Sequence, residues 1–338
     1  MSNYQTAYDM TRVLLQGESQ DGQVLSPDLI PEKVDLVLNM LGSQGMAIGI
    51  SREKLIRELE GLYTIWIGEG TILEDQQDHE PWLPQRRSEI EWDFWNRYRS
   101  YLEEKKGWSN RVVDRLEQLT DSILERLENP ERSGVWDRRG MVVGQVQSGK
   151  TSNYTGLVCK AVDSGYKLII VLAGLHNSLR SQTQLRLDEG FLGFNSQVHK
   201  AADAANSRIG AGTIPVGRFL IANSGTNSDE KGDFRTIVAN QYGVVPGSDP
   251  VLMVVKKNKT VLKNLVNWAV SIRGVEDPSL GRKIVRDVPL LVIDDEADNA
   301  SVNTKEVIKD ENGRLYIILC KRQTQPTLEG DCLCLAAA

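Results

Sequence analysis

The 338-residue sequence contains no apolar run long enough to cross a membrane, because a membrane-spanning helix needs about 20 mostly apolar residues in a row. Its first residues, MSNYQTAYDMTRVLLQGE, also lack the basic segment followed by an apolar one that marks a secretory signal. Disorder of the whole chain is excluded too, since 40% hydrophobic and 25% charged residues are ordinary values for a globular protein. We therefore expect a folded, cytoplasmic protein.

Cysteine and histidine are scarce and poorly placed for binding a metal. The chain has four cysteines and three histidines. Cys332 and Cys334 are separated by one residue instead of the two of a zinc knuckle, and His79, His176 and His199 lie far apart in the sequence. The spacing predicts neither a zinc site nor a disulfide framework, so we expect reduced thiols.

Positive charge is not in excess either. Lysine and arginine number 40 against 46 aspartates and glutamates, which gives a net charge of −6. This balance argues against strong nonspecific binding of nucleic acid by the whole molecule. A local basic track is compatible with it, so charge alone leaves the partner open.

The sequence does contain one complete phosphate-binding motif. Residues 144–151 read GQVQSGKT and match G-x-x-x-x-G-K-S/T at every fixed position. In such loops backbone N–H groups turn toward the β-phosphate, the lysine reaches the β and γ oxygens, and the last hydroxyl ligates Mg²⁺. An apolar run at 141–143 and apolar residues at helical spacing from 157 to 162 predict the required strand, loop and helix. We expect the nucleotide to be bound by Gly144, Gln145, Val146, Gln147, Ser148, Gly149, Lys150, Thr151 and Ser152.

A second motif completes the predicted site. The apolar residues 290–293 lead into Asp294, Asp295 and Glu296, which is the arrangement of a Walker B strand. A carboxylate at such a strand end holds Mg²⁺, and the next one orients the water that attacks the γ-phosphate. We assign Mg²⁺ to Asp295 together with Thr151, and the water to Glu296, which acts as a catalytic residue with Lys150. Asp294 is the register alternative for the metal.

Apolar runs recur after the phosphate loop, at 168–172, 219–222, 251–255 and 290–293. Such runs, separated by helical or polar segments, are typical of a parallel sheet covered by helices on both faces. Residues 131–308 therefore predict an α/β domain, whereas residues 1–130 carry helical patterns and predict a mainly α-helical N-terminal domain. The aromatic and arginine side chains of 82–108 form either a stacking platform for single-stranded nucleic acid or, as we favour, a packed core edged by arginines.

Two classes of nucleotide-binding protein are disfavoured. A GTPase should show Asn-Lys-x-Asp, but residues 258–261 read NKTV, and the serine-glycine-glycine signature of a transporter ATPase does not occur. The expected ligand is therefore ATP with Mg²⁺. Two alternatives stay open: Trp136 either stacks on adenine or packs at a hinge, and Lys256 and Lys257 either face a phosphate backbone or belong to a capping surface.

Four motifs, in order between about residues 130 and 305, together resemble the Z1 domain, a family of bacterial ATPases related to superfamily 2 helicases. They read GQVQSGKT, VLAGLHNSLRSQTQLRLD, VVKKN and IDDEADNASVNT, the last of which contains a D-E-A-D box. The resemblance implies a RecA-like P-loop fold, phosphate and Mg²⁺ binding by Lys150 and Thr151, and hydrolysis served by Asp295 and Glu296. It also places Asn177, Arg180 and Gln182 where related helicases touch the nucleic-acid backbone.

Z1 proteins are associated with restriction-like and phage-defence operons, beside methyltransferases, GHKL-type ATPases and nucleases. The resemblance therefore implies a helicase-like ATPase that remodels or translocates nucleic acid, DNA in the first place, within such a system. The alternative is a nucleotide-gated interaction module that recruits a nuclease or methyltransferase without motor activity.

The resemblance ends abruptly near Lys309. We expect residues 309–338 to form an irregular, non-native tail, and we hypothesise a truncation or a frame shift there. A superfamily 2 motor also needs a second RecA-like domain with an arginine finger, and the residues after Glu296 are too few to form one. We therefore expect the chain to bind ATP but to hydrolyse it poorly by itself.

Overall fold

The computed structural model describes residues 3–19, 29–43, 45–47, 49–63, 73–74, 79–108, 110–134, 136–144, 150–200, 207–278, 281–295 and 331–337. No helix within these ranges is both long and apolar enough to span a membrane.

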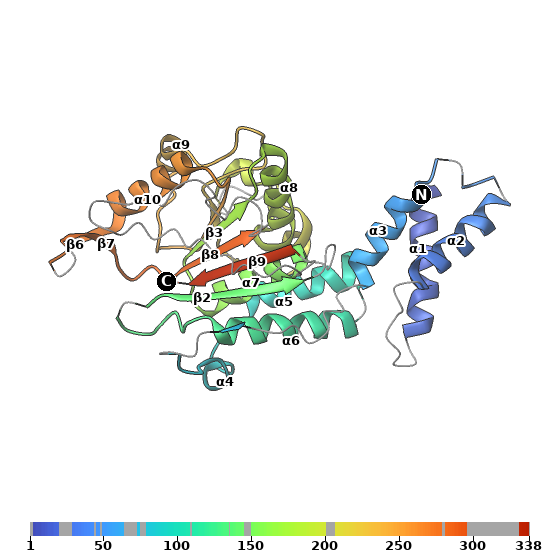
Figure 1. Ribbon diagram of the computed structural model, residues 1–338, viewed down its shortest axis with the longest axis horizontal. Coiled ribbons are helices and arrows are strands. Elements are labelled where there is room, and N and C mark those ends of the chain that lie inside the picture. Colours follow the sequence, from blue (N-terminus) through green and yellow to red (C-terminus); the bar gives the residue numbers. More distant parts are fainter. Residues whose placement is uncertain are drawn as a thin grey trace, which may run out of the picture.

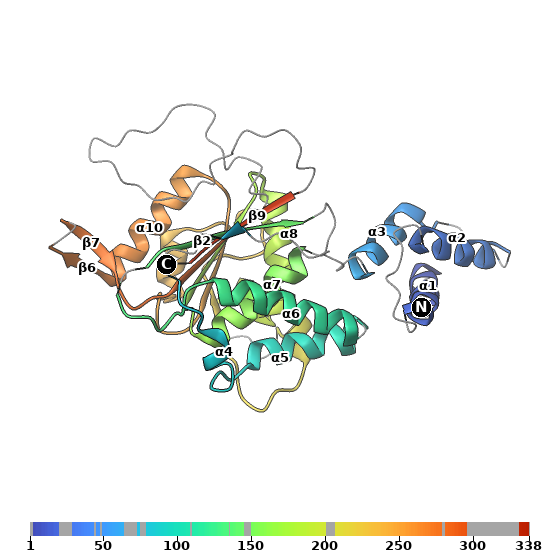
Figure 2. The same ribbon diagram turned by 60° about the horizontal axis from the view of Figure 1, so that its bottom comes forward.

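Three helices form a small unit at one side of the molecule (Figures 1 and 2). Their apolar residues, spaced three or four apart along each helix, meet in a core of their own. Ser51 caps the third helix as its sequence predicts, because its hydroxyl accepts a hydrogen bond from the Lys54 backbone N–H at 3.3 Å. The unit consists of α1 (Asn3–Ser19), α2 (Leu29–Gly42) and α3 (Arg52–Tyr63).

The next helices belong to the larger α/β body. Their buried aromatic side chains, among them Trp95 and Tyr98, share one core with α7 (Lys150–Ser164) and the central sheet. The core is thus continuous across residue 130, where we expected a domain boundary. The apolar stripe of a helix predicts that the helix is packed on one side, but it does not identify the element that covers that side. These elements are α4 (Leu83–Arg86), α5 (Asp93–Ser100), the π-helical turn η1 (Tyr101–Lys105) and α6 (Asn110–Arg126).

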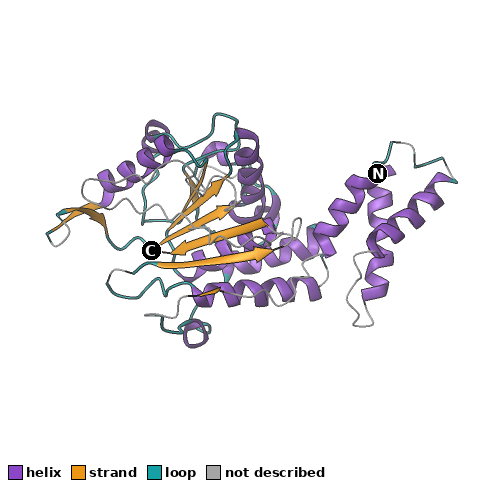
Figure 3. Ribbon diagram, in the orientation of Figure 1, coloured by secondary structure: helices purple, strands orange, loops and turns teal. Residues whose placement is uncertain are grey.

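One seven-stranded sheet forms the centre of this body, in the order β1-β2-β9-β8-β3-β5-β4 (Figure 3). Four neighbours, β8, β3, β5 and β4, are parallel, which makes the fold an α/β arrangement. β9 runs antiparallel to both β2 and β8, so β2 points in the same direction as the four parallel strands. The bounds are β1 (Leu73–Glu74), β2 (Arg138–Gly144), β3 (Leu168–Ala173), β4 (Asn223–Ser224), β5 (Val251–Val255), β8 (Leu290–Asp295) and β9 (Asp331–Ala337).

β9 lies in the segment 309–338 that we expected to be irregular. Its seven residues pair along the whole of β2, with Cys334 opposite Met141, and Leu335 pairs with Ile293 of β8. Residues 333–337 read LCLAA, a short apolar run suited to a strand with neighbours on both sides. Family motifs do not reveal such a strand. The rest of the segment, residues 309–330, lies outside the described part of the chain.

Helices cover both faces of the sheet, as the apolar runs predicted. Alternate residues of β3, β5 and β8, such as Ile293, face α5, α6 and α7, and the residues between them face α9 (Thr236–Gln241) and α10 (Lys259–Arg273). The expected strand at 219–222 begins later, at Asn223, because Phe219 and Ile221 are about half exposed instead of buried.

The remaining elements connect these layers. α8 (Asn177–Leu187) follows β3 and continues into the π-helical turn η2 (Asp188–Leu192). A hairpin projects beyond α10 (Figure 1). The hairpin and the short 3-10 turns are β6 (Gly274–Asp277), β7 (Arg282–Val285), η3 (Ser196–Val198) and η5 (Gly210–Thr213).

Candidate nucleotide site

The predicted phosphate-binding loop connects β2 to α7. β2 ends at Gly144 and α7 begins at Lys150, so strand, loop and helix follow one another as the motif requires. Outside the described part of the chain lie the side chain of Lys150, the loop residues Gln145, Val146, Gln147, Ser148 and Gly149, and the catalytic candidate Glu296.

Thr151 and Ser152 form the first turn of α7 and are half-buried. The Tyr98 hydroxyl lies 3.5 Å from the carbonyl oxygen of Ser152, so α5 supports this turn from one side. From the other side Arg186, in the last turn of α8, donates from Nη1 to the Thr151 hydroxyl at 2.8 Å. The hydroxyl that we assigned to Mg²⁺ therefore lies against a guanidinium that no motif indicated.

The two aspartates at the end of β8 lie on opposite faces of the sheet. Side chains alternate along a strand; Ile293 packs in the core that contains α7, whereas Val292 faces the core under α10. Asp295 continues the series of Ile293, and Asp294 that of Val292. Asp295 thus lies on the same face of the sheet as Thr151.

Asp294 is already paired with a lysine. Lys257, which follows β5, places Nζ 2.7 Å from Asp294 Oδ1, and both side chains are only 7% exposed. The Lys257 backbone N–H also donates to the Gly174 carbonyl at 3.0 Å, which ties the residue to the end of β3. This buried ion pair neutralises Asp294 and favours Asp295 over its register alternative as a metal ligand. It also turns Lys257 into the fold, away from any external phosphate.

Tyr154 adds a buried hydroxyl to the Thr151 face. Its side chain is fully buried, and its hydroxyl lies near those of Thr151 and Thr183 without a hydrogen bond of normal geometry to any described residue. Burial, reinforced by the negative charge of Asp295, raises the pKa of Tyr154 well above its ordinary value, although Arg186 opposes the shift. The phenol therefore stays protonated and directs an unsatisfied O–H group into this corner.

The strand before the phosphate loop and the strand that carries Asp295 are separated by one strand. β9 lies between β2 and β8, and neighbouring strands are about 4.8 Å apart, so the two strands lie about 10 Å apart. The start of α7 and Asp295 thus follow two strands that run in the same direction and flank β9.

Thr151 and Asp295 together offer a sparse donor set of one hydroxyl and one carboxylate. Among the residues with described side chains, no three His, Cys, Asp or Glu groups gather into a metal-binding cluster. Mg²⁺ suits such a set, because in nucleotide sites it binds one or two carboxylates and completes its shell with phosphate oxygens and water. The donors fit a Mg²⁺ ion that is carried in by a polyphosphate.

Arg180, which the Z1 resemblance places at a nucleic-acid backbone, is buried instead. Its guanidinium donates to the Asn227 carbonyl at 2.8 Å and to the Asp229 carbonyl. One turn later, Gln184 accepts a hydrogen bond from the Thr226 hydroxyl at 2.7 Å. These contacts join α8 to the segment 223–234, so Arg180 anchors a loop and is not available to a ligand.

Among the other sequence candidates for nucleic-acid contact, the segment 256–258 is also used inside the fold. Lys256 lies 3.7 Å from Asp233, and the Asn258 side chain caps α10 by accepting from the Thr260 and Val261 backbone N–H groups. The capping alternative therefore describes this segment better than a phosphate-facing one. Asn177 and Gln182 of α8 are exposed.

The aromatic residues of 82–108 form a packed core and not a stacking platform. Trp95 is 2% exposed and lies beneath Lys160, whose Nζ is 4.3 Å from the centre of its ring. Trp136 packs edge-to-face against Tyr166, with ring centres 6.2 Å apart, which agrees with hinge packing. The buried members of the cluster are Trp82, Phe94, Trp95, Tyr98 and Tyr101.

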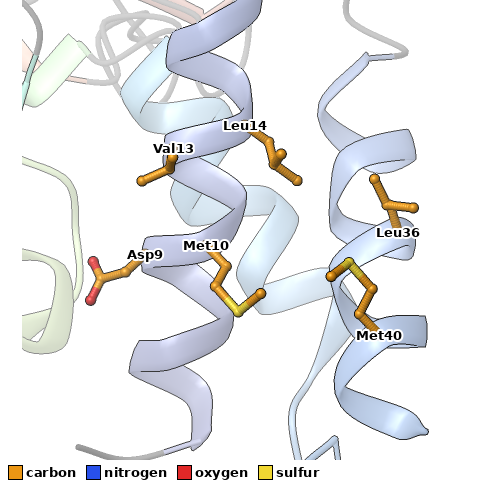
Figure 4. Close-up of a pocket in the computed structure, with 6 residues that line it drawn as sticks. All are labelled: Asp9, Met10, Val13, Leu14, Leu36 and Met40. Carbon is orange, nitrogen blue, oxygen red and sulfur yellow. The ribbon is translucent and has the colours of Figure 1, made fainter.

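A separate apolar groove of about 380 Å³ lies between α1 and α2. Figure 4 shows Met10 and Leu14 of α1 pointing toward Leu36 and Met40 of α2. Its lining is almost entirely apolar, so it offers no groups for binding phosphate.

The sequence motifs assign no role in the nucleotide site to three residues, Arg186, Tyr154 and Lys257, although Arg186 and Lys257 lie within two of the Z1-like motifs. Arg186 and Lys257 are far in sequence from the groups that they meet, whereas Tyr154 lies one helical turn after Thr151. The chain matches no protein-family model, no curated protein and no solved structure.

Proposed function

We propose that this chain is an ATP-binding and ATP-hydrolysing module with a RecA-like P-loop core, preceded by a helical N-terminal domain. The observation that carries the proposal is the placement of Thr151 and Asp295 on one face of one sheet, beside a complete G-x-x-x-x-G-K-T motif in strand-loop-helix order. This placement supports the proposal, because a nucleotide site needs both groups at the same edge of one sheet.

Elementary electrostatics supports a polyphosphate ligand at this position. The N-terminus of α7 carries partial positive charge over a 15-residue helix, and Lys150 and Arg186 add two cations. Asp295, at the end of β8, would hold Mg²⁺ together with Thr151, and Mg²⁺ neutralises phosphate charge when bound. Glu296, the next residue, would orient the attacking water.

Coupling to nucleic acid is the part of the proposal that rests on the Z1 resemblance. On that basis the module drives DNA remodelling or translocation in a restriction or phage-defence system, with a nuclease, methyltransferase or GHKL ATPase as partner. Because Arg180, Lys256 and Lys257 are engaged within the fold, DNA would have to contact other residues, such as the exposed Gln182.

One observation favours the alternative, a nucleotide-gated interaction module. α8 carries Arg186 at the nucleotide site and Arg180 at the 223–234 loop. A change at one end of this helix would therefore be transmitted to a polar surface loop, which could recruit a partner without motor activity. Titration of single-stranded and duplex DNA, with and without ATP and at several salt concentrations, separates the two functions. A motor should bind DNA in a nucleotide-dependent way, whereas a recruitment module should not bind it.

Nucleotide binding by the full chain tests the core of the proposal. A fluorescent ATP analogue should bind with Mg²⁺ and be displaced by ATP more readily than by GTP. Lys150→Ala should weaken binding by at least tenfold, whereas Lys263→Ala, an exposed lysine of α10, should not. Glu296→Gln should preserve binding and abolish any hydrolysis. Equal binding by the Lys150 variant and its control would refute the site.

A further inference from the structure

Arg186 occupies a position at the site that neither motif predicts. Its side chain is exposed and extends from the last turn of α8 to the Thr151 hydroxyl, with 2.8 Å between Nη1 and Oγ1. Within the described ranges, its guanidinium is paired with this hydroxyl and not with a carboxylate.

The turn after Arg186 fixes the end of α8 against α7. Gly190 of η2 approaches α7 so closely that a Cβ atom there would lie 2.6 Å from Thr155 Cγ2. Asp188 is buried and accepts hydrogen bonds from the Gln184 amide at 2.8 Å and from the Ser196 hydroxyl at 2.6 Å. The approach of Arg186 to Thr151 is therefore set by the packing of two helices.

A guanidinium and a Mg²⁺ ion compete for the Thr151 hydroxyl. The oxygen has two lone pairs, and two cations this close repel each other strongly where water is partly excluded. If the hydroxyl ligates Mg²⁺, Arg186 loses its acceptor and needs another. The planar fork of an arginine matches phosphate oxygens well, and the corner shared with Tyr154 and Asp295 is where a polyphosphate would be held.

We propose that Arg186 distinguishes a nucleoside triphosphate from a diphosphate. Arg186 donates to the Thr151 hydroxyl in this structure. When that hydroxyl ligates Mg²⁺, Arg186 donates instead to the γ-phosphate, which a diphosphate lacks. The inference rests on the proposed nucleotide site and adds to it a phosphate-binding arginine from the same chain. Because α8 also carries Arg180 and Gln184, this transfer couples the number of phosphates to the 223–234 loop.

Dissociation constants of Mg·ATP and Mg·ADP for the full chain test the proposal, measured by competition with a fluorescent nucleotide. Arg186→Ala should weaken Mg·ATP binding by about 10- to 100-fold, the range for loss of a charge-assisted hydrogen bond, and Mg·ADP by less than about threefold. Arg186→Lys should restore part of the difference. As a control, Arg115→Ala on the exposed side of α6 should leave both constants unchanged.

A second measurement follows the competition for Thr151 directly. Electron paramagnetic resonance of Mn²⁺ should show that Mn·ADP binds Arg186→Ala as tightly as the wild type or more tightly, because the competing guanidinium is gone. A merely structural role would weaken Mn·ADP as well.

The outcomes separate the two proposals. If Lys150→Ala loses nucleotide while Arg186→Ala keeps the wild-type ratio of the ATP and ADP constants, the role of Arg186 is overturned and the site stands. Equal losses for ATP and ADP in Arg186→Ala also overturn it. If the wild type binds neither nucleotide, both proposals fail.

Discussion

Replacing Asp294 by asparagine should destabilise the α/β body by about 3–5 kcal/mol, because it leaves the Lys257 ammonium buried and unpaired. The two charges are 2.7 Å apart and their side chains are 7% exposed. At an effective dielectric constant of about 20 they attract each other by about 6 kcal/mol, and removing both from water costs a comparable amount. The intact pair therefore contributes little net free energy, while loss of one partner is costly.

Urea unfolding followed by tryptophan fluorescence measures this effect. Six of the seven tryptophans lie at residue 82 or later, beyond α1–α3, so the signal reports mainly on the α/β body. Asp294→Asn and Lys257→Met should each lower the free energy of unfolding. The loss in the double variant should be smaller than the sum of the two single losses by at least about 2 kcal/mol. Asp295→Asn, at a half-buried residue, should lose less than about 1 kcal/mol.

The same variants separate stability from binding. Asp295→Asn should weaken Mg²⁺-dependent binding of ATP, whereas Asp294→Asn should keep it at temperatures where the variant is folded. Single losses below about 1 kcal/mol, or losses that add up in the double variant, would refute the argument that Lys257 neutralises Asp294. The preference for Asp295 as the metal ligand would then lose its support.

Three further predictions concern the supports of the site. Burial lowers the pKa of Lys160 to about 8 although Asp121 opposes the shift, so between pH 8 and about 10.4 the unfolded chain binds more protons at this residue than the folded one. The difference in free energy of unfolding between the wild type and Lys160→Met should therefore rise over this range, by at most about 3 kcal/mol. Urea unfolding at pH 7, 8, 9 and 10 measures this difference, and a difference that does not change with pH would contradict the prediction. Gly190→Ala should cost about 1–3 kcal/mol, since its Cβ would lie 2.6 Å from Thr155 Cγ2 and 2.9 Å from Tyr98 Cε2; an unchanged melting temperature would show that η2 does not press on α7. Arg180→Met should cost about 1–3 kcal/mol, because the carbonyls of Asn227 and Asp229 lose their donor, and amide exchange at residues 226–233 should accelerate, while Gln182→Ala changes neither.

The sequence patterns predict much of the α/β body because its strands are buried on both faces. The runs at 168–172, 251–255 and 290–293 are apolar throughout, and each forms a strand within a residue or two of the expected bounds. The strand predicted at 219–222 does not form there. Phe219 and Ile221 are about half exposed, so the apolar residues of this run do not reflect burial on both faces of a sheet. β9 and the packing of α5 and α6 on α7 depend on pairings between distant segments, which no local pattern specifies.

For the site, the sequence locates the residues but not their environment. The acidic triplet after residue 293 leaves Asp294 and Asp295 as alternatives, and only the alternation along β8, with Lys257 across β3, favours one of them. The sequence also does not show that Arg180 is buried. An arginine in a polar helix is usually solvated, but here its N–H groups donate to carbonyls of the 223–234 loop. Arg186, six residues later, reaches Thr151 only because η2 holds α8 on α7.

The position of β9 also has a consequence for the order of folding. β2 meets the four parallel strands only through β9, and the pairs Gly144–Asp331 and Arg138–Ala337 each join residues separated by more than half of the chain. Closing such a long loop is entropically unfavourable, and contacts of this kind form slowly. During synthesis β2 should therefore join the parallel strands only after residues 331–337 have left the ribosome. The nucleotide affinity that we propose should then be among the last properties that the folding chain acquires.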